Sequence, residues 1–174
     1  MMMRTAIPID QCALNTLRLF DNWLLLTAGD FAAQAYNAMT ISWGSLGTMW
    51  NKPFVQVVVR PTRYTYSFME RYPTFTLTAF PSQYKHALDL LGSKSGRDGD
   101  KIKDSGLTPI ASVKVAAPSF AEAELVLECK KIYFDDYEPT QFLADYIQKN
   151  YKNDFHRVYF GEILAIQGTA AYHV

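Results

Sequence analysis

The chain contains a series of strand-like segments that do not alternate regularly with helices. These segments are rich in β-branched and aromatic residues or alternate in polarity, and most are joined by short turns. Six or seven strands are predicted, over residues 23–29, 36–47, 53–61, 74–80, 110–118, 122–134 and 155–168, the last interrupted by Gly161. This order favours a mainly β fold, a closed barrel with peripheral helices, over a doubly wound sheet.

Two helices are predicted on either side of the strand at 74–80. The first follows Thr62, which can cap it, and Pro73 ends it. Its buried face is expected to carry Thr65, Phe68, Met69 and Tyr72. The second begins at Pro81 with Ser82 as its N-cap and ends near Gly92. Its expected buried face consists of Tyr84, Ala87, Leu88 and Leu91.

Two further segments are predicted outside the strands. Residues 93–109 are rich in charge, Gly and Ser, which is typical of an exposed excursion. Pro139 is expected to open a third helix. The buried stripe expected on that helix consists of Phe142, Leu143, Tyr146 and Ile147.

Composition indicates one globular domain over residues 1–174. The chain is 49% hydrophobic and 20% charged, and it has no internal repeat or linker. Its 17 basic residues balance its 17 acidic ones, so neither a nucleic-acid surface nor a polybasic membrane patch is expected. Because the start "MMMRTAIPID" does not resemble a signal peptide and no long apolar span occurs, we expect a cytoplasmic protein.

Metal and hydrolytic chemistry have little support in the sequence. Cys12 and Cys129 are far apart, and the three histidines are not paired at ligand spacing, so no metal site is predicted. Cys129 shares one strand face with Leu125 and Leu127 and is expected to be a packed core thiol. No H-E-x-x-H or G-x-S-x-G motif occurs, and "GSLG" is not a dinucleotide-binding glycine motif.

The stretch "YNAMTISWGSLG", residues 36–47, has one bulky face and one small, hydroxylated face. In an extended chain Met39, Ile41 and Trp43 point to one side, whereas the small face carries Ala38, Thr40 and Ser42. Such a face could let a planar ring approach the backbone. It could equally accommodate a crossing helix or a second subunit.

The hexapeptide "RPTRYT", residues 60–65, combines three features that attract an anion. A helix N-terminus presents free N–H groups, Arg60 and Arg63 can bind phosphate oxygens, and Thr65 adds a hydroxyl donor. A capped helix with two solvated or carboxylate-paired arginines is the alternative. Taken together with the small-residue face, the hexapeptide indicates a ligand with a flat head and a phosphate tail, a description that fits flavin mononucleotide (FMN).

The chain resembles the flavin reductase-like, FMN-binding split-barrel family, close to its flavoredoxin branch. The motifs "NAMTISWGSLG", "VVVRPTRYTYSFME", "FTLTAF" and "SGRDGDK" carry the resemblance, which runs from about residue 23 to residue 168. It implies a mainly β split barrel of the Greek-key type with peripheral helices. It also implies a homodimer with FMN at the subunit interface.

The resemblance also implies a set of cofactor-binding residues. Around the isoalloxazine ring or ribityl chain these are Asn37, Met39, Thr40, Ile41, Ser42 and Trp43. Around the phosphate they are Arg60, Arg63, Tyr64 and Thr65, with a loop carrying Ser95, Arg97, Asp98 and Lys101 closing over the flavin. Strict alternation puts Asn37 on the face opposite Thr40, so a bulge or strand end would be needed to bring them together. His156 and Glu162 are expected to be a surface histidine and a strand-edge carboxylate, although the family approaches the flavin near them.

The function expected from the resemblance is oxidoreduction through bound FMN, with NAD(P)H or a redox protein partner as the electron source. The cofactor would carry the redox chemistry, so the lack of an acid–base constellation is consistent with activity. A non-enzymatic flavoredoxin-type carrier is the alternative, and an FMN-free binding domain is the third interpretation.

Overall fold

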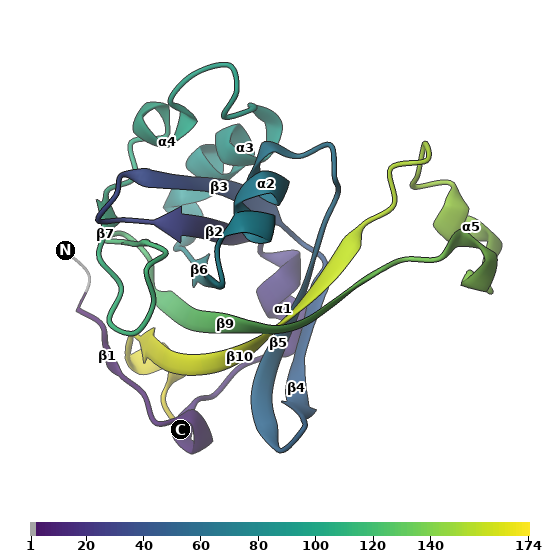
Figure 1. The fold of residues 1–174 in the computed structure, drawn as a ribbon. Helices are drawn as coiled ribbons and strands as arrows, with labels where there is room; N and C mark the ends of the chain where they lie inside the picture. The colour runs from purple at the N-terminus through teal and green to yellow at the C-terminus, as the bar shows by residue number, and fades with distance from the viewer. Residues whose placement is uncertain (1–2) are drawn as a thin grey trace.

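The computed structural model describes residues 3–174 and shows a mainly β protein with peripheral helices (Figure 1). Its main sheet has eight strands in the order β3-β2-β6-β9-β10-β5-β4, with β1 paired to β10. The strands are β1 (Thr5–Ala6), β2 (Leu24–Asp30), β3 (Ala35–Ile41), β4 (Gly44–Met49), β5 (Lys52–Val59), β6 (Thr74–Ala79), β7 (Pro109–Ile110), β8 (Ser119–Phe120), β9 (Leu125–Asp136) and β10 (Arg157–Gly168). Met1 and Met2, which begin the segment interpreted as lacking a signal peptide, lie outside the described residues.

The helices are short and lie around the sheet (Figure 1). They are α1 (Thr16–Asp21), α2 (Tyr64–Arg71), α3 (Lys85–Ser93), α4 (Lys101–Asp104) and α5 (Asp145–Gln148). Single 3₁₀ turns occupy Ile9–Gln11, Ser82–Tyr84, Pro139–Gln141 and Ala170–Tyr172. In the described part of the chain, no helix is long and apolar enough to cross a lipid bilayer.

Strand β10 is the centre of the sheet because it pairs with β9, β5 and β1. Its register with β9 shifts between Phe160 and Gly161 and again between Ile163 and Ala165. A Cβ atom at Gly161 would lie 2.7 Å from Cε1 of Phe75 and 3.0 Å from Cβ of Cys129. Strand β10 nevertheless runs unbroken through Gly161, so the predicted interruption there is wrong. The extra residue of the first register shift is Ile132 in β9, and the lack of a side chain at Gly161 lets β10 lie this close to the core.

The main sheet curls so that its two edges meet at one corner. Strand β3 pairs with β2 at one end of the strand order, and β4 pairs with β5 at the other. Only Ser42 and Trp43 separate β3 from β4, so the edges approach each other there. The prediction of one strand over 36–47 is wrong, because the chain changes its partner strand from β2 to β5 after Ile41. Strands β3 and β4 do not pair with each other, so the barrel is not closed by strand pairing. Residue alternation does not specify a strand's partner.

Other strand predictions are confirmed. Strands β2 and β3 form the expected antiparallel hairpin, with Leu24 opposite Ile41. Within β5, Val55, Val57 and Val59 are fully buried, and Val58 on the opposite face is 5% exposed. This strand is therefore covered on both faces, as its β-branched run predicts.

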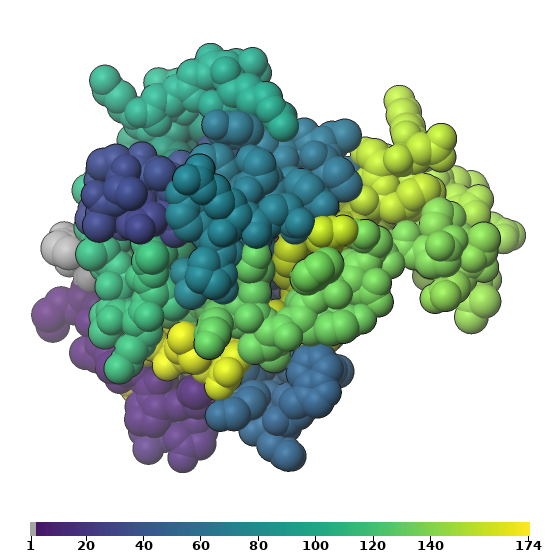
Figure 2. Space-filling view, in the orientation of Figure 1, coloured from purple at the N-terminus to yellow at the C-terminus, as the bar shows by residue number. Residues whose placement is uncertain are grey.

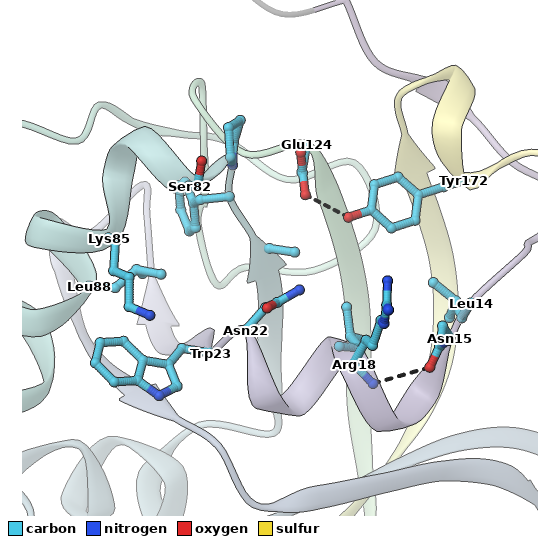
Figure 3. Close-up of a pocket in the computed structure, with 14 residues that line it drawn as sticks. Leu14, Asn15, Arg18, Asn22, Trp23, Ser82, Lys85, Leu88, Glu124 and Tyr172 are labelled. Atoms are coloured by element: carbon cyan, nitrogen blue, oxygen red, sulfur yellow. Dashed lines mark hydrogen bonds between the residues drawn. The ribbon is translucent and has the colours of Figure 1, made fainter.

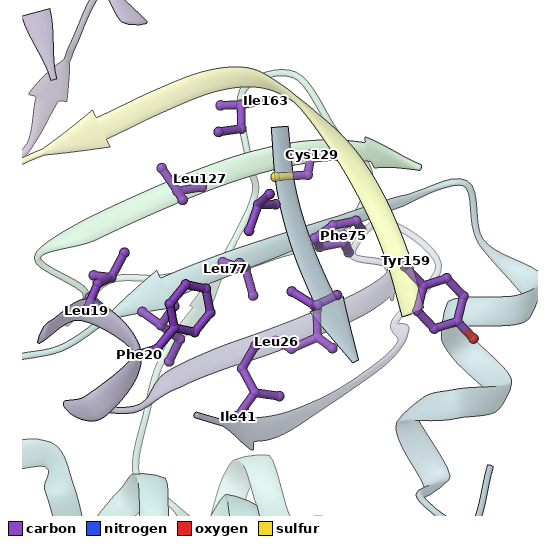
Figure 4. Packing of buried hydrophobic residues seen from close by; sticks show 14 of the residues in the cluster. Leu19, Phe20, Leu26, Ile41, Phe75, Leu77, Leu127, Cys129, Tyr159 and Ile163 are labelled. Atoms are coloured by element: carbon purple, nitrogen blue, oxygen red, sulfur yellow. The ribbon is translucent and has the colours of Figure 1, made fainter. Parts of the chain in front are cut away.

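Two hydrophobic clusters lie on the two faces of the curled sheet. The larger fills its interior, where Leu26, Phe75, Leu127 and the fully buried thiol of Cys129 pack together (Figure 4). The smaller cluster lies between the sheet and α3, and it consists of Leu25, Ala38, Phe80, Ala87, Leu88, Leu91, Ile102, Leu107, Phe120, Ala123 and Val126. The prediction that Cys129 is a packed core thiol is confirmed.

The predicted strand over 110–118 is almost entirely wrong. Only Ile110 belongs to a strand there, the two-residue β7. The buried carboxylate of Glu128 accepts hydrogen bonds from the backbone N–H groups of Val113 (2.9 Å) and Lys114 (2.5 Å). These backbone donors are satisfied by a side chain, so the segment has less need of a neighbouring strand.

The predicted helix after Pro139 is reduced to one 3₁₀ turn and the single helical turn α5. Residues 137–156 form an arm that projects from the body of the molecule (Figures 1 and 2). The expected buried stripe is wrong, because Leu143 is 97% exposed and Tyr146 is 71% exposed. Within the arm, Phe142 packs instead against Tyr137, Tyr151 and Phe155.

Both helix-capping predictions are wrong, although the predicted buried faces hold. Arg63, not Thr62, occupies the N-cap of α2 and makes no side-chain cap hydrogen bond. Ser82 lies in the 3₁₀ turn before α3, whose N-cap is Tyr84. The N-caps therefore lie one residue later than predicted for α2 and two residues later for α3, while the interior faces of both helices follow the helical spacing.

Replacing Gly161 by alanine should destabilise the protein, because the added methyl group would overlap the ring of Phe75. We expect the Gly161→Ala variant to lose about 1–3 kcal/mol of unfolding free energy, measured by urea denaturation. Gly47→Ala is the matched control, since Gly47 lies on the exposed edge strand β4 and its Cβ would lie 3.2 Å from the nearest atom, Cε1 of Phe54. It should change stability by less than about 0.5 kcal/mol. Equal losses in the two variants would contradict this account of Gly161.

Candidate functional site

Helices α2 and α3 pack on opposite faces of the edge strand β3. Nδ2 of Asn37 donates to Oγ1 of Thr65 in α2 (2.7 Å), and the hydroxyl of Thr40 donates to the carbonyl of Leu88 in α3. These two strand residues point to opposite sides, as the strict alternation predicted. The start of α2 and the end of α3 consequently lie near each other around β3.

A cavity of about 150 Å³ lies where the start of α2 meets the end of α3, and we call it the α2–α3 cavity. Its lining residues are Thr62, Arg63, Tyr64, Thr65, Ser93, Lys94, Ser95, Arg97 and Lys101. The structure thus brings together two predicted groups, the hexapeptide at the start of α2 and the loop after α3. Sequence reasoning missed Ser93 and Lys94 because they were assigned to an exposed excursion.

Two cations that line the α2–α3 cavity, Arg63 and Lys101, are at least partly buried and have no carboxylate partner among residues 3–174. Lys101 is only 3% exposed, and its Nζ donates to the carbonyls of Leu91 (2.8 Å) and Lys94 (3.0 Å). Burial and the neighbouring Arg63 lower the pKa of Lys101 to about 8. The guanidinium of Arg63 donates to the carbonyl of Gly92, and its pKa is lowered by burial and by Arg60. Since burying an unpaired charge costs free energy, the cavity favours an anion.

A hydroxyl donor and a third cation, the exposed Arg97, complete the lining of the α2–α3 cavity. Because Oγ1 of Thr65 accepts from Asn37, its own hydroxyl hydrogen is left to donate. The guanidinium carbon of Arg97 lies 5.0 Å from the ring centroid of Tyr64, and Arg97 donates to the carbonyl of Thr62 (3.2 Å). This arrangement holds the loop after α3 against the first turn of α2.

The same loop is fixed to β3 by close packing at Gly96. A Cβ atom there would lie 2.5 Å from Oδ1 of Asn37 and 2.7 Å from Cδ1 of Tyr64. A second cavity, of about 320 Å³, includes Tyr36, Asn37, Gly96 and Lys101 in its lining. The prediction that residues 93–109 form an exposed excursion is therefore only partly right. Lys101, Ile102 and Leu107 are buried, and α4 occupies part of the segment.

The small-residue face of β3 is covered by α3. Ala38 packs in the cluster beneath that helix, and a Cβ atom at Gly92 would lie 3.2 Å from Cβ of Thr40. Of the alternatives raised by the sequence, the crossing helix explains Ala38 and Thr40. Ser42 is exposed beyond the helix end, at a cavity of about 290 Å³ that we call the Ser42 cavity. Ser93 lines both this cavity and the α2–α3 cavity, so the two adjoin the last turn of α3.

Other predicted site residues are dispersed. Met39 and Ile41 are buried in the interior cluster, although Ile41 also lines the Ser42 cavity. Trp43 is 44% exposed, and Asp98 lines none of these three cavities. Arg60 is carboxylate-paired, as one alternative held, because its Nη1 lies 2.7 Å from Oδ2 of Asp154. It does not line the α2–α3 cavity.

The prediction of a surface histidine at position 156 is wrong. His156 is 8% exposed, its Nδ1 lies 2.9 Å from the hydroxyl of Tyr151, and its ring centroid lies 5.3 Å from that of Trp43. Burial, and secondly the charge of Arg60, lower its pKa to about 4, so it is neutral near pH 7. Glu162 is not at a sheet edge either, since β10 is central, and it pairs with Lys52 at 3.4 Å.

Among residues 3–174, no three or more His, Cys, Asp or Glu side chains are grouped so that they could hold a metal ion. The candidate site is therefore defined by cations and hydroxyl groups at the α2–α3 cavity, next to a surface that ends at Ser42 and Trp43. The structure thus defines a class of protein with a curled, mainly β sheet and a cationic cavity beside an edge strand.

Comparison with known proteins identifies the family. A family model described as a flavin reductase like domain matches residues 19–169, so this chain belongs to the flavin reductase-like family. An uncharacterized protein of Pyrococcus abyssi is 29% identical over 120 residues, which cover 68% of this chain and 67% of that protein.

Solved structures show the same fold. An FMN-binding domain of a flavin reductases-like enzyme from Shewanella baltica matches with a TM-score of 0.69 and 19% identity, covering 95% of this chain and 77% of that one. The flavoredoxin of Desulfovibrio vulgaris matches with a TM-score of 0.67 and 22% identity, covering 97% and 78%. The flavoredoxin of Methanosarcina acetivorans matches with a TM-score of 0.66 and 23% identity, covering 88% and 71%. The predicted membership in the flavin reductase-like family is confirmed, and flavoredoxins are among the proteins that share the fold.

The buried charge of Lys101 should make stability depend on pH. Its pKa of about 8 in the folded protein lies below the ordinary value of 10.5, so the folded protein loses this proton at lower pH than the unfolded chain. The unfolding free energy should therefore rise between about pH 8 and pH 10 relative to Lys101→Met. Urea denaturation across this range measures the difference, with Lys103→Met on the exposed side of α4 as control. A wild-type profile parallel to that of Lys101→Met would contradict the assignment.

Proposed function

We propose that this protein binds FMN, with the phosphate in the α2–α3 cavity and the flavin ring toward the Ser42 cavity. The observation that carries the proposal is the pair of cations, Arg63 and Lys101, that point into one cavity without a carboxylate partner among residues 3–174. Membership in the flavin reductase-like family supports it, and the similar structure from Shewanella baltica is an FMN-binding domain.

The roles proposed for the lining residues follow from their contacts. Arg63 and Lys101 would neutralise the phosphate, and the hydroxyls of Thr65 and Ser95 would donate to its oxygens. Since the hydroxyl of Thr40 already donates to Leu88, the donors near the ring would be Ser42 and backbone N–H groups. Asn37 would act as a positioning residue that orients the Thr65 hydroxyl.

We further propose that the bound FMN passes electrons between NAD(P)H and an acceptor, as in a flavin reductase-like oxidoreductase. FMN supplies the redox chemistry when bound, whereas the protein supplies position and electrostatics. A flavoredoxin-type carrier, exchanging electrons with a protein partner, is the second candidate, and the similarity to two flavoredoxins favours it.

A homodimer with FMN at the subunit interface is part of the proposal. The single chain exposes several large apolar side chains, which is unusual unless a partner covers them. They include Trp50 (58% exposed), Phe134 (56%), Leu143 (97%) and Tyr146 (71%). Two of these residues, Leu143 and Tyr146, lie in the projecting arm, which would bury them by packing against a second copy.

The phosphate assignment predicts a difference between two ligands. Arg63→Ala should weaken FMN binding about 10- to 150-fold, the loss of one charge-assisted contact, while riboflavin, which has no phosphate, should lose little. Fluorescence quenching of each flavin measures the two affinities. Arg60→Ala should weaken FMN less, because Arg60 is paired with Asp154. An equal loss of FMN and riboflavin in Arg63→Ala would show that the arginine contacts something other than phosphate.

The enzyme and carrier proposals differ in turnover. We expect purified protein to be yellow and to consume NADH or NADPH steadily when free flavin is added, followed at the nicotinamide absorbance. A yellow protein that does not consume either nucleotide would favour the carrier. A colourless protein that also fails to quench added FMN fluorescence would defeat both.

A further inference from the structure

A cavity outside the candidate site lies between α1 and the start of α3, and we call it the α1 cavity (Figure 3). It has a volume of about 530 Å³, within the range of small-molecule sites. None of its lining residues lines the α2–α3 cavity. It is therefore separate from the proposed phosphate site.

The wall of the α1 cavity is largely apolar. Leu14 and Leu19 come from the α1 region, Phe80 and Pro81 from the end of β6, and Leu88 from α3. Such side chains favour an apolar body of moderate size, because its burial removes apolar surface from water.

Trp23 adds a strained aromatic residue to this wall. It connects α1 to β2 with a φ of 67°, in the left-handed region that a bulky side chain seldom adopts. Residues held in such conformations are concentrated at ligand sites. Figure 3 shows its indole beside Lys85, whose Nζ lies 4.8 Å from the ring centroid.

The charged residues that line the α1 cavity are Arg18, Lys85 and Glu124. Within residues 3–174, neither Arg18 nor Lys85 forms an ion pair, and neither charged group donates a hydrogen bond to another residue. The one carboxylate in the lining, Glu124, accepts a hydrogen bond from the hydroxyl of Tyr172 at 2.7 Å (Figure 3). The lining therefore carries two cations without acidic partners in the described chain and one carboxylate that is hydrogen-bonded to a tyrosine, a formal net charge of +1.

We infer that the α1 cavity binds a small organic anion with a flat apolar body, of the aromatic carboxylate class. The apolar wall and Trp23 would hold the ring, and Lys85 and Arg18 would together attract the carboxylate. A neutral aromatic compound would keep the first contact and lose the second. This inference does not depend on the proposed FMN site.

The test compares 2-naphthoate with 2-naphthalenemethanol, its uncharged counterpart, by isothermal titration of the full chain. We expect 2-naphthoate to bind at least about tenfold more tightly. Lys85→Met and Arg18→Met keep apolar side chains but remove one charge each. Each should weaken 2-naphthoate about fivefold or more and leave 2-naphthalenemethanol within about twofold. Thermal denaturation establishes that both variants are folded.

Two controls distinguish this site from non-specific binding and from the flavin site. Lys149→Met removes an exposed charge from the arm and should leave both affinities unchanged. Arg63→Ala should leave 2-naphthoate binding unchanged as well. The inference is overturned if 2-naphthoate binds no better than the alcohol, or if Lys149→Met weakens it as much as Lys85→Met. It is also overturned if Arg63→Ala abolishes its binding.

Discussion

The structure depends on how closely β10 lies against the core at Gly161. This strand pairs with β9, β5 and β1, so any bend in it is transmitted to most of the sheet. Because Gly161 has no side chain, the strand can lie against the ring of Phe75 and bend over the interior cluster. The register shift beside it adds a residue to β9, at Ile132. As a result the sheet curls until β3 and β4, at opposite ends of its strand order, are only Ser42 and Trp43 apart.

The candidate site follows from that curvature and from the free edge of β3. Because successive side chains of the strand point to opposite faces, one face receives α2 through Asn37 and the other receives α3 through Ala38 and Thr40. The helices meet around the edge, and Arg63 and Lys101 are brought into one cavity. Each loses hydration there without gaining a carboxylate from the described chain, which lowers the pKa of both. The fold thus uses packing energy to hold two like charges where an anion would stabilise them.

Helix α3 links three cavities of different character. Its last turn borders the α2–α3 cavity and the Ser42 cavity, whereas its first turn borders the α1 cavity through Lys85. Trp23 and Leu88 line both the α1 cavity and the Ser42 cavity, so the two cavities share these side chains as a common wall. A ligand in the α1 cavity would therefore lie next to residues at the proposed flavin-ring site. Both charged cavities favour anions because Arg63 and Lys101 in one, and Arg18 and Lys85 in the other, lack acidic partners within residues 3–174.

Local patterns in the sequence determined the strands β2, β5, β6, β9 and β10, the buried faces of α2 and α3, the buried Cys129, and the grouping of Arg63, Tyr64 and Thr65. These features depend on spacing along a few turns or strand residues, which the chain itself specifies. Only the tertiary structure decided that 36–47 is divided between two sheet edges, that Glu128 replaces a strand partner for 113–114, and that Arg60 pairs with Asp154. It also decided that the stripe of Leu143 and Tyr146 remains exposed and that His156 is buried. Each of these outcomes depends on which distant segment supplies a partner, and alternation or composition within one segment carries no information about that.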